Sequence, residues 1–134
     1  MAGRPTPRVL FVCVHNAGRS QMAAALFNLH ARGRAIADSA GTQPAARIHP
    51  EVVQAMRELD IDLSRAVPKQ LTASLAGGAA RAVTMGCGDE CPVLSVPVED
   101  WPLPDPAGRP LPEVRLIRDE IDRRVRVLLT QLLD

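Results

Sequence analysis

Short apolar segments alternate with amphipathic ones along this chain. Residues 8–14 form a nearly continuous apolar run, partly β-branched and followed by a Gly-containing loop, which is typical of a buried strand in a parallel sheet. Three further strands are expected, at 35–40, 80–85 and 93–98, the last one irregular because it contains Pro97. Apolar residues at spacings of three or four, together with Pro and Gly boundaries, predict helices at 20–32, 50–59, 68–75 and 111–133.

The helical patterns also predict which side chains face the core. In 20–32 we expect Met22, Ala25, Leu26 and Leu29 to share one inward face. In 111–133 the basic residues fall mostly between the apolar positions, so we expect them on the solvent-exposed face of the helix; they are Arg118, Arg123, Arg124 and Arg126.

The alternation of strands and helices predicts the architecture. We expect one α/β domain over residues 1–134, a three-layer sandwich around a central, mainly parallel four-stranded sheet. In open α/β sheets, ligands bind beyond the carboxyl ends of the strands. The segments expected there are 15–19, 86–92 and part of the Pro-rich stretch 99–112.

Composition narrows the function classes. The 134 residues are 46% hydrophobic and 23% charged, which is ordinary globular composition. A net charge of +1 and the scarcity of aromatic residues argue against a nucleic-acid-binding protein, and no apolar run approaches a membrane span. Residues 1–8 lack the apolar core of an export signal, so we expect a cytoplasmic protein. Three cysteines, an odd number, suit thiol chemistry in a reducing compartment better than a disulfide framework.

The loop after the first strand carries the chemistry that is easiest to interpret. Cys13 stands at the strand end and Arg19 six residues later, at a helix start. A loop entering a helix directs several backbone N–H groups at one point, and the Arg19 fork suits a tetrahedral oxyanion. The same positive field favours the thiolate form of Cys13, to which Ser20 could donate a hydrogen bond. The residues expected to hold the anion are Val14, His15, Asn16, Ala17, Gly18, Arg19 and Ser20.

Plainer interpretations of this loop remain open at this point. Cys13 could be a buried residue at a strand end before a capped helix. His15 could help stabilise the thiolate, or it could be an exposed loop side chain. Gly18 suits a turn with positive φ or a close approach of the backbone to the anion.

Residues 9–23 resemble the signature of the low-molecular-weight protein tyrosine phosphatase superfamily, and within it the three-cysteine, thioredoxin-coupled arsenate reductases. The resemblance extends over essentially the whole chain, through 39–41, 83–89, 99–101, 105–108 and 117–121. It implies a low-molecular-weight phosphatase-like fold. It also implies that the loop binds arsenate, with phosphate or sulfate as competing anions, and that no metal or cofactor is bound.

Cys87 and Cys91 are expected to distinguish a reductase from a phosphatase. Reducing arsenate takes two electrons and therefore a second thiol, whereas a phosphatase needs only one. The resemblance implies a relay in which Cys87 attacks Cys13 and Cys91 then attacks Cys87. Gly86 and Gly88 would ease the required movement. Alternatively, the two cysteines are inert, bind zinc together with a histidine, or protect Cys13 from over-oxidation in a phosphatase.

The remaining expectations concern the acid and the partner. The resemblance assigns to Asp105, which precedes a proline, the protonation of the leaving oxygen; a simple turn-forming Asp-Pro is the alternative. It also implies an external thiol reductant, thioredoxin or a glutaredoxin- or mycoredoxin-type protein, acting on a monomer. Two positions depart from the pattern. Ala24 stands where relatives often carry a Glu of a potassium site, and Ala107 stands where the phosphatases carry an aromatic residue.

The runner-up activity is a low-molecular-weight phosphatase acting on phosphotyrosine or small esters. A protein that senses oxyanions or redox state without turnover is a third possibility. These alternatives share the Cys13 loop and differ in what happens after an anion has bound.

Overall fold

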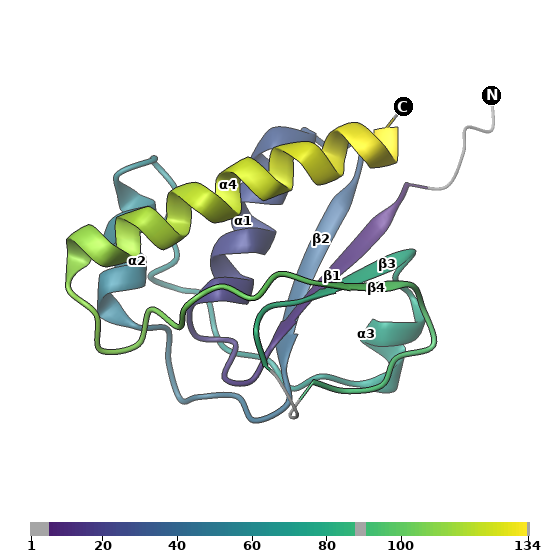
Figure 1. Cartoon of the computed structure of the whole chain (residues 1–134), viewed down its shortest axis with the longest axis horizontal. Helices are drawn as coiled ribbons and strands as arrows, with labels where there is room; N and C mark the ends of the chain where they lie inside the picture. Colours follow the sequence, from purple (N-terminus) through teal and green to yellow (C-terminus); the bar gives the residue numbers. More distant parts are fainter. Residues whose placement is uncertain (1–5, 88–90, 134) are drawn as a thin grey trace.

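The computed structural model describes residues 6–87 and 91–133 and contains one four-stranded sheet (Figure 1). All neighbouring strands are parallel, in the order β2-β1-β3-β4. The strands are β1 (Arg8–Cys13), β2 (Ile36–Gly41), β3 (Arg81–Thr84) and β4 (Val98–Asp100). The helices are α1 (Arg19–Ala31), α2 (Pro50–Arg57), α3 (Ala73–Gly77) and α4 (Leu111–Leu133). The predicted α/β sandwich with a parallel four-stranded sheet is confirmed.

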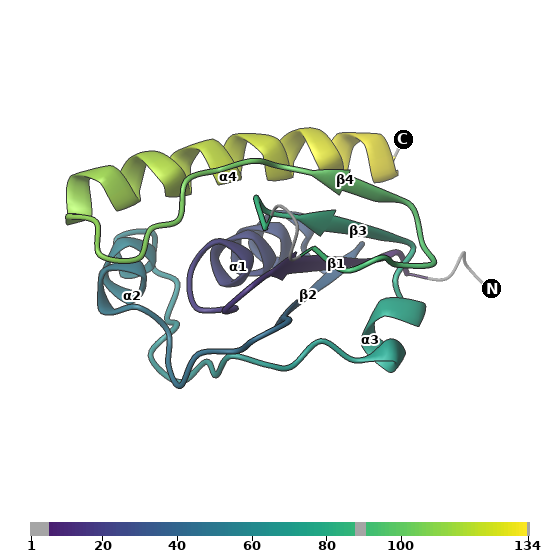
Figure 2. The ribbon, with the colours of Figure 1, turned by 60° about the horizontal axis from the view of Figure 1, so that its bottom comes forward.

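Strand β1 divides the core into two layers. Its side chains alternate, so Val9, Phe11 and Cys13 join the larger cluster with α1, α2 and α4, whereas Leu10 and Val12 join a smaller one on the α3 side. Figure 2 shows α4 and α1 on one side of the sheet and α3 on the other. A strand buried on both faces needs a continuous apolar sequence, which is why the 8–14 run predicted it correctly.

The fourth strand lies later than predicted. Residues 91–97 have no regular structure, and pairing with β3 begins with Val98 opposite Ala82. The apolar run misled the prediction because Val93 is fully exposed. Pro97 lacks an N–H, but its carbonyl accepts a hydrogen bond from Ala82 N at 2.9 Å, so the ladder starts beside it.

The third helix is also shorter than predicted. Residues 69–71 run extended beside the end of β2, since Gly41 N donates to Lys69 O and Leu71 N donates to Gly41 O, both at 2.8 Å. The helix begins only after Thr72, whose hydroxyl accepts a hydrogen bond from Leu75 N at 3.1 Å.

Two predicted side-chain positions are wrong. Leu29 of α1 is half exposed, although Met22 and Leu26 are buried as expected. Arg118 of α4 is buried, and its guanidinium donates to Ala55 O and to Glu58, both at 2.8 Å. A long Arg side chain can lie against the neighbouring helix and still satisfy its charge, which helical periodicity does not reveal.

Candidate active site

The loop between β1 and α1 surrounds the sulfur of Cys13. This cysteine is free and only 3% exposed. Asn16 N donates to its Sγ at 3.2 Å, and Ser20 Oγ forms a second hydrogen bond at 2.8 Å. Ser20 Oγ also accepts from Asn16 Nδ2 at 2.7 Å, which directs the hydroxyl hydrogen towards the sulfur. The two donors suit a negatively charged sulfur.

Asn16 fixes the shape of this loop. It is fully buried and holds a left-handed conformation, with φ of 51°, which costs energy in most residues other than Gly. Its Oδ1 accepts hydrogen bonds from Gln21 Nε2 at 2.9 Å and Lys69 N at 2.8 Å. The Asn16 side chain therefore joins the loop to α1 and to the segment at Lys69. Gln21 lies within the recognised 9–23 segment, but only the fold places the Lys69 backbone here.

Arg19, the first residue of α1, is held from the opposite side of the site. Its side chain is nearly buried, and Nη1 donates to Leu103 O at 2.8 Å. Nη2 lies 3.9 Å from Asp105 Oδ2. The first backbone N–H groups of α1, which have no acceptor within the helix, lie at the same end. The structure thus brings Asp105 beside Arg19, although it lies 86 positions further along the chain, and places it at one side of residues 14–20, which are expected to hold the anion and are called the anion loop below.

The segment carrying Asp105 packs directly on the anion loop. An ideal Cβ at Gly18 would lie 2.6 Å from Pro106 Cγ, so a side chain there would force the two loops apart. The φ of Gly18 is −147°, so the expected positive φ is wrong, and the close neighbour that requires a glycine here is Pro106. Asp105 itself is half exposed, and its Oδ1 accepts from Ala107 N at 2.9 Å. The Asp-Pro turn therefore coexists with a position beside Arg19.

The other two cysteines follow the strand next to β1. Cys87 comes three residues after the end of β3, and it forms a disulfide with Cys91 across a Cα–Cα distance of 5.0 Å. Cys87 is 9% exposed, and Cys91 is more accessible. Gly86 has a φ of 77°, a backbone conformation that favours glycine. Gly88 lies outside the described residues.

The remaining predicted loop residues differ in burial. His15 is exposed, which favours its interpretation as a surface side chain, and Val14 is half-buried. Ala17 is buried between the loop and the helix that follows. Among the described residues, no group of three His, Cys, Asp or Glu side chains could hold a metal ion.

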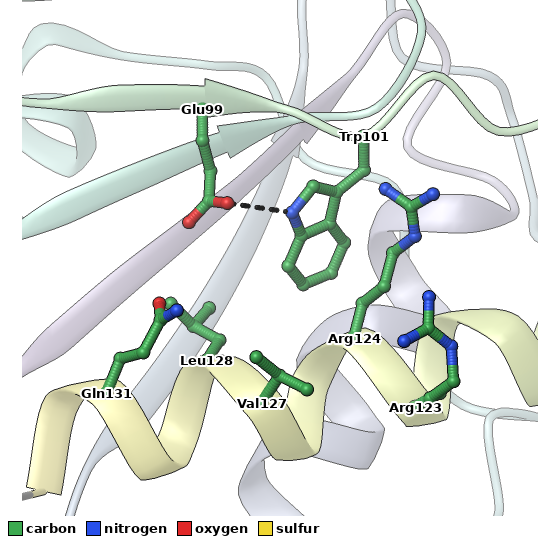
Figure 3. A pocket seen from close by; sticks show the side chains of 7 residues that line it. All are labelled: Glu99, Trp101, Arg123, Arg124, Val127, Leu128 and Gln131. Atoms are coloured by element: carbon green, nitrogen blue, oxygen red, sulfur yellow. Dashed lines mark hydrogen bonds between the residues drawn. The ribbon is translucent and has the colours of Figure 1, made fainter.

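A separate groove of about 360 Å³ lies between β4 and α4 (Figure 3). Trp101 forms its wall and donates from Nε1 to Glu99 Oε2 at 3.1 Å. Arg123 and Arg124 border the groove, but both are paired with Glu120. Neither the anion loop nor the disulfide contributes to its lining.

A buried thiol in a loop at the end of a parallel strand is a feature by which a protein family can be defined. Comparison with known sequences identifies that family. Residues 8–88 match the sequence model of the low molecular weight phosphotyrosine protein phosphatases, and the chain belongs to this family. Within it, the chain is 40% identical over 131 residues to a putative arsenate reductase of Halobacterium salinarum, a match that covers 93% of this chain and 92% of that protein.

Two further relatives are named for their reductants. A solved thioredoxin-dependent arsenate reductase from Corynebacterium glutamicum has a TM-score of 0.82 and 40% identity; the match covers 99% of this chain and 66% of that one. The chain therefore spans about two thirds of that protein's length. A glutaredoxin arsenate reductase from Synechocystis is 31% identical over 129 residues, covering 93% of this chain and 98% of its own. Among the described residues, no helix is both long and apolar enough to span a membrane.

Proposed function

We propose that this protein reduces arsenate to arsenite with its own three cysteines. One observation carries the proposal: a buried free thiol in an anion loop at the end of β1, with a Cys87–Cys91 disulfide after the adjacent strand β3. A hydrolase would use Cys13 and its loop, and would leave Cys87 and Cys91 without a role. The relatives named as arsenate reductases support the same conclusion.

The first step takes place in the anion loop. Arsenate binds to the backbone N–H groups at the start of α1 and to the guanidinium of Arg19. The Cys13 sulfur, stabilised by hydrogen bonds from Asn16 and Ser20, attacks arsenic. An S–As bond forms and one As–O bond breaks; Asp105, beside Arg19, protonates the oxygen that leaves as water.

Two thiol exchanges follow. The Cys87 thiolate attacks the Cys13 sulfur, an S–S bond forms, and the S–As electron pair stays with arsenic, which leaves as arsenite. Arsenic gains two electrons and the two thiols lose them. Cys91 then attacks Cys87 and releases the Cys13 thiolate, leaving the Cys87–Cys91 disulfide seen in the structure.

Accessibility suggests how the cycle closes. The relay moves the disulfide from a site 3% exposed at Cys13, through Cys87 at 9%, to the more accessible Cys91. A protein dithiol could reach the last of these far more easily than the first. We therefore propose a thioredoxin-like reductant acting on a cytoplasmic monomer, with a glutaredoxin- or mycoredoxin-type donor as the alternative.

The test is arsenate-dependent NADPH oxidation with thioredoxin and thioredoxin reductase, repeated with a glutaredoxin system. We expect sustained turnover in at least one system, and its loss in the Cys87→Ser variant after at most one arsenate per chain. If Cys87→Ser hydrolyses an aryl phosphate at the parent rate and neither system supports arsenate turnover, the protein is a phosphatase. Oxidation of Cys13 without sustained arsenite production from any reductant would indicate a sensor.

A further inference from the structure

The turn that leads into Cys87 is packed against the anion site. Met85 N donates to Val12 O at 3.0 Å and its side chain is fully buried, so the chain stays fixed to β1 up to this residue. At the next residue, an ideal Cβ on Gly86 would lie 3.0 Å from Arg19 Nη1 and 3.1 Å from Leu103 O. The first residue after this fixed part of the chain is therefore a glycine, and a side chain at its position would meet Arg19 and the carbonyl that holds it.

Asp100, the last residue of β4, holds this turn from the outside. Its Oδ1 accepts hydrogen bonds from Thr84 Oγ1 at 2.7 Å and from Gly86 N at 3.2 Å. Thr84 and Asp100 are paired in register, and Trp101 N donates to Thr84 O at 2.7 Å. One carboxylate oxygen thus joins the end of β4 both to the end of β3 and to the backbone N–H of Gly86, the residue before Cys87.

The neighbouring carboxylate makes different contacts. Glu99 bonds to Trp101 Nε1 and lies 3.6 Å from Arg81 Nη1, and Figure 3 shows it in the groove facing α4. The two acidic residues are adjacent on one short strand, so they point to opposite faces of the sheet. Glu99 therefore provides a matched control for Asp100.

We propose that Asp100 is a positioning residue for the thiol relay. By fixing the Gly86 N–H, its carboxylate holds the Met85–Gly86 peptide in place. The chain that carries Cys87 can then turn only at the bonds after this peptide, and Cys87 stays within reach of Cys13. This inference rests on the proposed function, because it concerns the step in which Cys87 attacks Cys13. Without the anchor, the Gly86 peptide gains freedom, and the effective concentration of Cys87 at Cys13 falls.

The attack can be measured without arsenate. In a Cys91→Ser parent, one of the two remaining thiols is converted into a mixed disulfide with 2-thiopyridine. The other thiolate then attacks the labelled sulfur, the Cys13–Cys87 bond forms, and thiopyridone leaves with the S–S electron pair. Its absorbance reports the rate of closure, and peptide mapping confirms the bond. The same parent mixed with arsenate gives the rate with the natural leaving group.

Added to this parent, Asp100→Ala is expected to slow closure about fivefold or more, equivalent to about 1 kcal/mol at 1.36 kcal/mol per tenfold. Asp100→Asn keeps an acceptor oxygen and is expected to stay within about twofold, as is Glu99→Gln. Phosphate affinity should change less than about twofold in all three, which separates positioning from general damage to the loop.

Two results would overturn the inference: closure in Asp100→Ala at the parent rate, or equal slowing in Asp100→Ala and Glu99→Gln. If Asp100→Ala does not fold, Asp100→Leu replaces it, since Leu fills similar space without an acceptor. If the Cys13–Cys87 bond of the Cys91→Ser parent forms with the thiopyridine label but not with arsenate, the proposed arsenate chemistry is refuted. The role of Asp100 is then decided by the rates measured with the thiopyridine label.

Discussion

Replacing Arg19 by Lys tests the anion site most directly, because it keeps the positive charge and removes the planar fork. In the structure one arm of the fork is already engaged, since Nη1 donates to Leu103 O at 2.8 Å. The other arm, Nη2, lies on the Asp105 side at 3.9 Å. A Lys ammonium has a single nitrogen and cannot occupy both places. It must either leave the Leu103 carbonyl unpaired or turn away from the anion.

The size of the effect follows from the bond that is lost. A hydrogen bond to a charged group contributes about 1.5–3 kcal/mol, and the buried position of Arg19 places it in the upper part of that range. At 1.36 kcal/mol per tenfold, losing one arm worth about 2.2–3 kcal/mol lowers kcat/KM for arsenate by roughly 40- to 160-fold. Because the free anion meets the same fork, phosphate affinity should fall in parallel.

The measurement combines arsenate turnover with calorimetric titration of phosphate, which does not depend on the reductase chemistry. Arg126→Lys serves as the control, since this exposed arginine of α4 pairs only with Asp122 among its described ion pairs. Thermal unfolding verifies that both variants are folded. An Arg19→Lys protein with kcat/KM and phosphate affinity within about twofold of the parent would refute the assignment of Arg19 to the anion.

Two further predictions concern carboxylates. Asp105→Asn should slow the Cys13 attack in a single turnover at least about tenfold while leaving phosphate affinity within about threefold, as measured by rapid quench, because an amide cannot supply the proton; an unchanged single-turnover rate would remove Asp105 from this role. Hydrogen bonds from Arg115, and then from Arg118, lower the pKa of Glu58 from 4.5 to about 2. The unfolded chain therefore binds a proton at Glu58 at higher pH than the folded chain does, so this contribution to stability is complete above about pH 4.5 and is lost as pH falls towards 2. Denaturant titrations of the parent and Glu58→Gln should show a stability difference that shrinks over this interval, and a difference independent of pH would contradict the assignment.

Much of the fold could be predicted because the strongest patterns were also the most buried. The 8–14 run became β1, at the centre of the sheet, and the long periodic segment 111–133 became α4 with the same bounds. Prediction failed where the fold placed a segment differently from its local pattern. Val93 belongs to an apolar run that predicted a strand, but it is exposed. Lys69 belongs to a predicted helix, but a hydrogen bond from Gly41 at the end of β2 holds it in an extended segment.

The parts of the candidate site that could be predicted from the sequence are those formed by side chains. Cys13 and Arg19 were recognisable from residue type and spacing, whereas Asp105 was assigned through the family resemblance; the structure places Arg19 and Asp105 side by side. The carbonyl of Leu103 and the N–H of Lys69, by contrast, act through the backbone, which leaves no mark in residue identity. Such contacts depend on which segments the fold brings together, so they appear only in three dimensions.

The hydrogen bond from Arg19 to Leu103 joins residues 84 positions apart, which has a consequence for how the protein matures. The anion loop is synthesised before β3 and β4, but the carbonyl that orients its arginine arrives only after both of these strands have been made. Contacts of such long range form late, because the intervening chain must first be ordered. A nascent or truncated chain that lacks β4 therefore carries the nucleophile without an oriented arginine. Reactivity towards oxyanions should begin only when the last strand has joined the sheet, so the polypeptide does not engage its substrate before it has the means to complete the reaction.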